Sequence, residues 1–140
     1  MSFIRAALAA ALLLAPASAG AEAIVARVSV SSQTMYVYLD GMLRYEWPVS
    51  TARAGKYTPR GEWRPQWLSR WHRSSLYNNA PMHYAIFYDG DYAIHATDAV
   101  SRLGRPASAG CVRLHEDNAA LLFAMVQEQG MDNMRVVVVD

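Results

Sequence analysis

The chain contains one cysteine, Cys111, and a histidine upstream of it, His95, at the end of a predicted strand. A thiolate prepared by an imidazole attacks acyl carbons well, and a cysteine with a histidine elsewhere in the sequence is typical of that arrangement. Gly110 precedes the cysteine and allows close backbone approach, and Arg113 follows it as a fixed cation. The pattern predicts nucleophilic catalysis, with Cys111 as nucleophile and His95 as general acid and base.

The N-terminal residues have the composition of an export signal. Arg5 precedes an apolar run over residues 6–15, which is followed by Pro16 and the small-residue triplet Ala17-Ser18-Ala19. The run is too short to span a bilayer, and this order predicts a signal peptide over residues 1–19, with cleavage as late as residue 23 at a second A-x-A site. We expect an exported protein of the periplasm or cell wall, with no membrane anchor.

The remaining residues, 20–140, are enough for one domain with one core. The composition is 53% hydrophobic and 18% charged, which favours a folded globular domain over a disordered chain. A net charge of +1 gives no indication of nucleic-acid binding. A single cysteine excludes disulfides within the chain, so its stability must come from packing.

Alternating apolar and polar residues predict β structure over residues 24–50, interrupted by the turn signal Asp40-Gly41. A second such signal, Asp89-Gly90, separates an apolar run from the strand that ends at His95. Residues 116–129 have apolar positions at helical spacing and predict one substantial helix after the cysteine, followed by a closing strand over residues 136–139. The predicted fold is therefore mainly β with one helix.

The segment from Glu62 to Pro81 has poor periodicity, and long irregular segments inside a domain are usually functional or mobile. It contains Trp67, Trp71 and Tyr77, which we consider as a candidate lid over the substrate cleft. The alternative is that the tryptophans fill the core. The two interpretations are compatible, because one tryptophan can anchor the loop while another faces the ligand.

Several segments together resemble the YkuD-type L,D-transpeptidase catalytic domain. They are His95-Ala96-Thr97, the run Ser108-Ala109-Gly110-Cys111-Val112-Arg113, Thr58-Pro59-Arg60-Gly61 and Pro81-Met82. The resemblance covers essentially the whole chain after the signal sequence. It implies a β-sandwich or mixed-sheet fold of the YkuD kind, and an exported cell-wall enzyme.

The resemblance also implies roles for the groups around the thiol. The backbone carbonyl of Ala96 would orient the second ring nitrogen of His95. The backbone N–H groups of Gly110 and Cys111 would form an oxyanion hole, because preorganised donors stabilise the charge that develops on the carbonyl oxygen. Arg113 would order the loop or hold a substrate carboxylate.

The chain departs from the family pattern at Ala109, where the family has a histidine before Gly-Cys. An alanine can neither donate a proton nor hydrogen-bond to substrate through its side chain. His115 is a poor substitute, because it is predicted at the start of the helix. Ser108 is expected to support the loop rather than to react.

The implied reaction is acyl transfer on peptidoglycan stem peptides, in which a thioester forms on Cys111 and terminal D-alanine leaves. Carbapenems are the expected covalent inhibitors. Hydrolysis at the same site, by an L,D-carboxypeptidase or a wall-protein amidase, is one alternative, and a non-catalytic wall-binding module with a buried thiol is another. We expect no cofactor and no metal, because the histidines lack ligand spacing with acidic neighbours. These histidines are His72, His83, His95 and His115.

Overall fold

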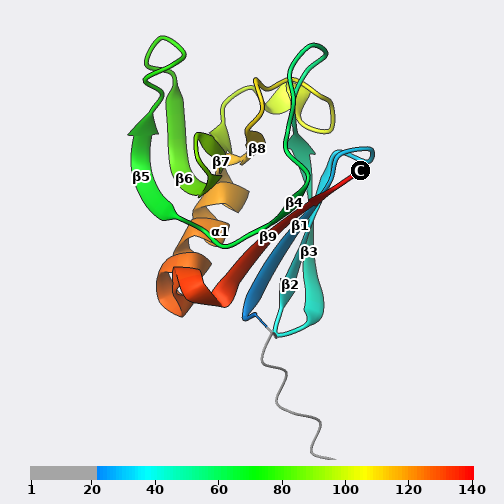
Figure 1. The fold of residues 1–140 in the computed structure, drawn as a ribbon, viewed down its shortest axis with the longest axis vertical. Coiled ribbons are helices and arrows are strands. Elements are labelled where there is room, and N and C mark those ends of the chain that lie inside the picture. The colour runs from blue at the N-terminus through cyan, green and yellow to red at the C-terminus, as the bar shows by residue number, and fades with distance from the viewer. Residues whose placement is uncertain (1–21) are drawn as a thin grey trace, which may run out of the picture.

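A computed structural model describes residues 22–140 (Figure 1). The predicted signal peptide, residues 1–19, lies outside the described residues. The strands are β1 (Ile24–Ser29), β2 (Thr34–Leu39), β3 (Met42–Ser50), β4 (Gly61–Trp63), β5 (Trp67–Arg73), β6 (Pro81–Asp89), β7 (Tyr92–Thr97), β8 (Val112–His115) and β9 (Met134–Val139). The helices are α1 (Glu116–Gln129) and two 3₁₀ turns, η1 (Val100–Arg102) and η2 (Met131–Asn133). The prediction of a mainly β fold with one substantial helix is confirmed.

The strands form one mixed sheet in the order β4-β9-β1-β2-β3-β8-β7-β6-β5. β3 joins its two halves, because its first part pairs with β2 and its last residues, Val49 and Ser50, pair with β8. Two neighbouring pairs are parallel, β1 with β9 and β7 with β8, and the other pairs are antiparallel. Figure 1 shows the β5–β6 hairpin curling away from the half that contains β1 to β3.

The predicted turns lie where the sequence placed them. β2 ends at Leu39 and β3 begins at Met42, and Asp40 and Gly41 between them both have positive φ, at 49° and 81°. Two consecutive residues with positive φ match the right-handed twist of the flanking strands. The second turn connects β6 to β7 and contains Gly90 at a φ of 56°. It sends the chain back along β7 toward His95.

α1 covers one face of the strands that carry the candidate site. Its buried residues are Ala119, Leu122, Phe123 and Val126. They pack in one core cluster with Ile94 and Ala96 of β7 and with Val112 and Leu114 of β8. Full burial of a leucine or phenylalanine side chain stabilises the fold by roughly 1.5–3 kcal/mol. The face of β7 and β8 that packs against α1 therefore belongs to the hydrophobic core. The odd-numbered residues of β7 and β8, including His95, are left to the opposite face.

The prediction of an irregular segment between Glu62 and Pro81 is wrong in part. This segment contains β5 and all of β4 except Gly61, and β5 pairs along its length with β6. β5 is an edge strand of the sheet, and Trp67 and Trp71 on it are 45% and 63% exposed. These two large apolar side chains are exposed to solvent. The segment therefore lacks the alternation of apolar and polar residues that marks a strand with one buried face. The loop over residues 74–80 is the part that stays irregular.

Candidate active site

A cleft of about 840 Å³ lies on the face of the sheet opposite α1, and both Cys111 and His95 line it. Its other walls are the β5–β6 loop, the start of β7 and the segment from Thr97 to Ala99. Arg113, Ser108, Gly110 and Ala96 also border the cleft. Residues separated by long stretches of sequence are thus gathered in one concave site.

The parallel pairing of β7 and β8 places His95 and Cys111, the residue before β8, on one face of the sheet. His95 pairs with Arg113, and Ile94 pairs with Val112. Successive side chains of a strand alternate between faces, so His95, Cys111 and Arg113 share the face that α1 leaves uncovered. Cys111 packs there beside a small apolar cluster that contains Phe87 and Ala93.

His95 is oriented by the backbone of the next residue. Its Nδ1 lies 2.7 Å from the carbonyl oxygen of Ala96. Because a carbonyl can only accept, we assign the ring proton to Nδ1, which leaves the lone pair on Nε2. The side chain is only 6% exposed. Burial lowers the pKa of His95 to about 4, against the raising effect of the Ala96 bond and with smaller lowering effects from Arg113 and His72. The imidazole is therefore neutral at pH 7.

The thiol of Cys111 is also held in its neutral form. Burial raises its pKa, while the Ala93 backbone amide and Arg113 act in the opposite direction and Asp91 adds to the increase. The Sγ atom donates to the carbonyl oxygen of Asp91 at 3.7 Å, a long contact of the kind that sulfur makes. The thiol and the imidazole are therefore both neutral, and a thiolate would form only when an imidazole removes the thiol proton.

Ser108 organises the loop over residues 107–111, which ends at the predicted nucleophile Cys111 and which we call the nucleophile loop. Its Oγ donates to the carbonyl oxygen of Cys111 at 2.6 Å and accepts from the N–H of Gly110 at 3.0 Å. The residue is fully buried, so these bonds are shielded from water. The Gly110 N–H is consequently engaged, whereas the sequence analysis predicted it as a free oxyanion donor. Of the predicted pair, this leaves the Cys111 N–H as the principal candidate donor.

Gly110 is required at its position for two reasons. Its φ of 143° lies in a region that L side chains rarely adopt. A Cβ atom there would also lie 2.6 Å from Cε1 of Tyr92 and 2.8 Å from the carbonyl oxygen of Tyr57. Both distances are shorter than the non-bonded contacts that Cβ atoms make in proteins. The chain can therefore pass between these two tyrosines only because this residue has no side chain.

Thr58 clamps the nucleophile loop from a neighbouring segment, a role that the sequence analysis missed. Its buried Oγ1 donates to the carbonyl oxygen of Gly110 at 2.9 Å and accepts from the N–H of Ala52 at 3.0 Å. The backbone N–H groups of Ala107 and Ser108 both donate to the carbonyl oxygen of Thr51, each at 2.9 Å. The sequence does contain a signal for this residue, the Thr58-Pro59-Arg60-Gly61 segment that resembles the family. The hydrogen-bond partners of Thr58, Gly110 and Ala52, are brought to it only by folding.

Replacing Thr58 with valine should loosen the loop. Valine keeps the shape and loses the hydroxyl, which leaves the Gly110 carbonyl and the Ala52 N–H without partners. A buried unpaired polar group costs about 1–3 kcal/mol, so we expect the free energy of unfolding to fall by that order. Urea denaturation measures this loss. The rate at which iodoacetamide alkylates Cys111 reports how firmly the loop is held, and it should change when the loop loosens. Thr58→Ser is the matched control, because it keeps the hydroxyl. An unchanged Thr58→Val protein would contradict the clamp.

Arg113 is half-buried in the cleft wall, and its guanidinium donates to the Ala107 carbonyl across a long 3.5 Å contact. Burial lowers its pKa, and Arg53 and Arg102 add to that effect, whereas Cys111 and Asp98 act in the opposite direction. The group remains a cation at neutral pH, because the ordinary guanidinium pKa is very high. Arg113 therefore places a positive charge on the same face as the thiol.

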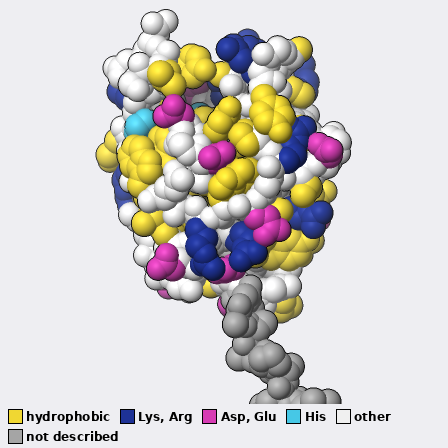
Figure 2. All heavy atoms as spheres, in the orientation of Figure 1, with side chains coloured by type: hydrophobic (Ala, Val, Ile, Leu, Met, Phe, Trp, Pro, Cys, Tyr) yellow, Lys and Arg dark blue, Asp and Glu magenta, His cyan; other side chains and the backbone are white. Residues whose placement is uncertain are grey.

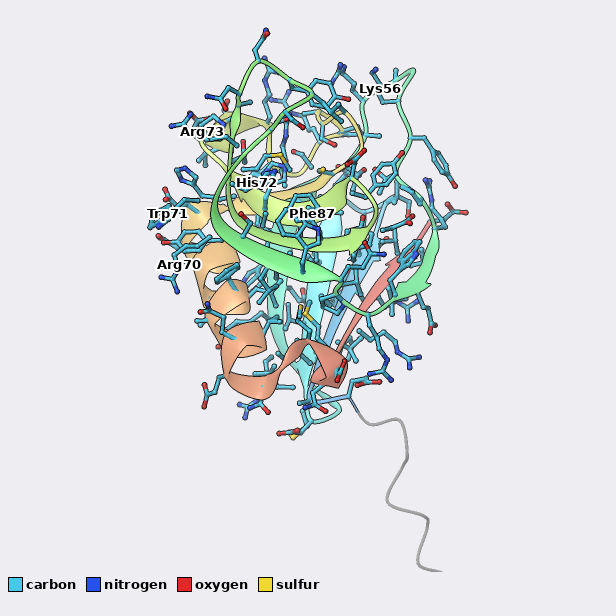
Figure 3. The ribbon with its side chains drawn as sticks, turned by 60° about the vertical axis from the view of Figure 1, so that its left-hand side comes forward. Lys56, Arg70, Trp71, His72, Arg73 and Phe87 are labelled. Carbon is cyan, nitrogen blue, oxygen red and sulfur yellow. The ribbon has the colours of Figure 1, made fainter. Side chains whose placement is uncertain are left out.

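The three aromatic residues considered as a lid have different positions. Tyr77 lies in the β5–β6 loop, lines the cleft and is 50% exposed. Trp67 stacks on Phe87 with ring centroids 4.1 Å apart, and Trp71 packs edge-on against His83. Both tryptophans lie on β5, and neither lines the cleft. Figure 3 shows Trp71 and Arg70 on the side of β5 next to α1, whereas His72 and Phe87 lie inward.

The other histidines do not replace His95. His115 caps the N-terminus of α1, where its Nδ1 accepts from the Asp117 N–H at 3.1 Å, and it does not line the cleft. Ala109 lines the cleft, so the position of the family's second histidine faces the site. His72 of β5 is a further imidazole in the cleft wall, with its ring 4.8 Å from that of Phe87.

No metal site is found in residues 22–140, where no three His, Cys, Asp or Glu side chains are grouped to hold an ion. In the same part of the chain, no helix has the length and apolar character needed to cross a membrane.

The model of the YkuD family, described as the L,D-transpeptidase catalytic domain, matches residues 23–139. A comparison with curated proteins gave no match.

Solved structures of L,D-transpeptidases share the fold. One is an L,D-transpeptidase from Mycobacterium tuberculosis H37Rv, with a TM-score of 0.76 and 23% identity over 84% of this chain and 58% of that one. Another is an LD transpeptidase in complex with imipenem, with a TM-score of 0.75 and 24% identity over 84% and 59%. A third is L,D-transpeptidase 3 from Mycobacterium tuberculosis with a faropenem-derived adduct, with a TM-score of 0.74 and 20% identity over 84% and 60%. The chain thus spans less than two thirds of each.

Proposed function

Because the chain belongs to the YkuD family of L,D-transpeptidase catalytic domains, we propose that it is a cysteine acyltransferase that acts on peptidoglycan stem peptides. The observation that carries the proposal is the position of Cys111 and His95, which line one cleft, His95 from β7 and Cys111 from the residue just before the parallel strand β8. The proposal includes export to the periplasm or cell wall, on the basis of the sequence pattern of residues 1–19.

In the first step, Cys111 Sγ attacks the carbonyl carbon of the third stem residue. Nε2 of His95 accepts the thiol proton as the carbon–sulfur bond forms, and the carbonyl oxygen becomes an oxyanion. The neutral state of both groups supports this order, because neither must change its charge before substrate binds. The intermediate then expels the amine of the terminal D-alanine, which takes the proton from His95 and leaves a thioester.

We assign stabilisation of the oxyanion to the backbone N–H of Cys111. The N–H of Gly110 can contribute if its bond to Ser108 Oγ is shared or exchanged when substrate binds. Preorganised donors of this kind lower the barrier without reorganisation at the moment of reaction. Arg113 adds positive charge on the same face of the sheet, and Ser108 keeps the loop closed through the Cys111 carbonyl.

In the second step, an amine of an acceptor peptide attacks the thioester carbon. His95 accepts a proton from the amine and returns it to the departing sulfur, which restores the free thiol. Water in place of the amine gives hydrolysis through the same steps. The loop over residues 74–80 would limit access of water, because Leu76 and Tyr77 present apolar side chains beside the cleft. Tyr77 is therefore the remaining lid candidate of the three aromatic residues.

The experiment that tests the function is incubation of the purified protein with muropeptides, followed by mass analysis of the products. Transpeptidation gives a cross-linked product and free D-alanine. Hydrolysis gives the shortened stem peptide and D-alanine without cross-links, and would identify an L,D-carboxypeptidase. Absence of any change, with a folded protein and a reactive thiol, would contradict acyl transfer on this substrate.

Carbapenems should acylate the protein at Cys111. Solved structures of the same fold include a complex with imipenem and a faropenem-derived adduct, which supports the expectation. Intact-mass analysis should show one added drug molecule per chain, and peptide mapping should place it on residue 111. Cys111→Ala is the control and should show no adduct. Failure of every carbapenem to react, although iodoacetamide labels the thiol, would contradict the proposed site.

A further inference from the structure

Four arginines converge at the end of the cleft nearest the nucleophile loop. A second cavity of about 280 Å³ is lined by Arg53, Arg102 and Arg105, together with Pro106 and Ala107. Arg53 also lines the catalytic cleft, as does Arg113. One peptide bond separates Ala107, in the wall of the small cavity, from Ser108, in the wall of the cleft. The two spaces are therefore neighbours.

Hydrogen bonds fix the backbone from which these arginines project. The Arg53 N–H donates to the Ser108 carbonyl at 2.9 Å, which ties its segment to the nucleophile loop. The Arg102 carbonyl accepts from Ser50 Oγ at 2.9 Å, and the Gly104 N–H donates to the Val49 carbonyl at 2.8 Å. The guanidinium groups are thus presented from a backbone held against β3.

Within the described residues, no carboxylate lies at ion-pair distance from this cluster, and Asp98 acts on Arg113 only from a longer distance. In residues 22–140, Arg60, Arg64 and Arg135 form ion pairs with carboxylates. Among the same residues, no ion pair involves the four arginines of the cluster, which are Arg53, Arg102, Arg105 and Arg113. Figure 2 shows Lys and Arg side chains at the upper end of the molecule, where Figure 1 places the loops that carry Arg53 and Arg102. Like charges gathered with no carboxylate at ion-pair distance favour an anionic ligand.

We propose that the cavity beside the cleft is an anion subsite that binds a carboxylate of the peptide substrate, away from the carbonyl that reacts. This inference rests on the proposed function for the identity of the peptide. Guanidinium groups bind carboxylates through paired N–H donors, and such charge-assisted bonds are stronger than neutral ones. Arg102 and Arg105 line the cavity and not the cleft, so they are the residues that separate this subsite from the catalytic groups.

Equilibrium binding to the Cys111→Ala protein tests the subsite without any turnover. The probes are two synthetic tetrapeptides, L-alanyl-D-γ-glutamyl-L-lysyl-D-alanine and its counterpart with the glutamyl α-carboxylate amidated. Calorimetry should show that the acid form binds about three- to tenfold more tightly than the amide form, as expected for one charge-assisted contact. The Arg102→Gln/Arg105→Gln double variant should lose this preference and bind the amide form unchanged.

Arg44→Gln is the matched control, because Arg44 is an exposed cation on β3 that lines neither cavity. It should keep the preference. The tripeptides that lack D-alanine form a second arm, which resolves whether the carboxylate belongs to the acyl donor or to the acceptor. Equal affinities of the acid and amide forms in both arms, or an equal loss in Arg44→Gln, would overturn the subsite. Product analysis with muropeptides tests acyl transfer separately, so a failure of one proposal is not a failure of the other.

Discussion

Replacing Cys111 with serine is expected to abolish acyl transfer, with a fall in rate of at least about 10³-fold. A hydroxyl is a far weaker nucleophile than a thiol near neutral pH. The neutral His95 must then remove a proton from a much weaker acid. The rate of D-alanine release from muropeptides measures the effect, and intact mass shows whether any acyl-enzyme accumulates.

The fold should survive this change, because the two side chains differ by one atom of similar size. Cys111 packs only at the border of the small cluster formed by Met82, Ala85, Phe87 and Ala93. We expect the free energy of unfolding to change by less than about 1 kcal/mol, as is usual for a substitution that creates no large cavity. Normal turnover by a folded Cys111→Ser protein would falsify the assignment of the nucleophile.

Replacing His95 with glutamine should lower the rate of acylation by about 10²- to 10⁴-fold. The same imidazole accepts the thiol proton and later protonates the leaving amine. The other histidine on these two strands, His115 of β8, does not line the cleft. The rate of single-turnover acylation by imipenem measures the first step, in which His95 accepts the thiol proton as the bond to sulfur forms. His115→Ala is the matched control and should react at the normal rate, because that side chain caps α1 outside the cleft.

The pH dependence gives a second readout of the same residue. With a His95 pKa of about 4, kcat/KM should fall only as the pH approaches 4, where the imidazole becomes protonated and can no longer act as a base. A fall centred near 6.5, the ordinary value for histidine, would contradict the buried neutral imidazole.

The free energy of unfolding should also depend on the protonation of His95. The unfolded imidazole binds a proton below about pH 6.5, whereas the folded one stays neutral until about pH 4, so stability is lost as the pH falls through that interval. The shift corresponds to about 3 kcal/mol. Denaturation at pH 7 and pH 4 should therefore show a loss that is smaller in His95→Gln by about that amount. An equal loss in both proteins would show that His95 does not titrate in this way.

Local chemistry in the sequence was enough to predict most of the regular structure. Asp40-Gly41 marks the first hairpin because few residue pairs tolerate two consecutive positive φ values, and both have them. The apolar spacing of residues 116–129 predicts α1 with its observed bounds, because one face of that helix is buried. β5 escaped prediction because it is an edge strand with exposed tryptophans, and β8 because it has only four residues.

The predicted reactive pair came from the sequence alone: one cysteine in the chain, and one histidine at the end of a predicted strand. Only the tertiary structure decided that they line one cleft, because the parallel register of β7 and β8 puts both on the face opposite α1. It also decided their charge, since burial disfavours the ionised form of each. Burial, register and the bond from Thr58 to Gly110 depend on segments far apart along the chain. No local pattern can encode them.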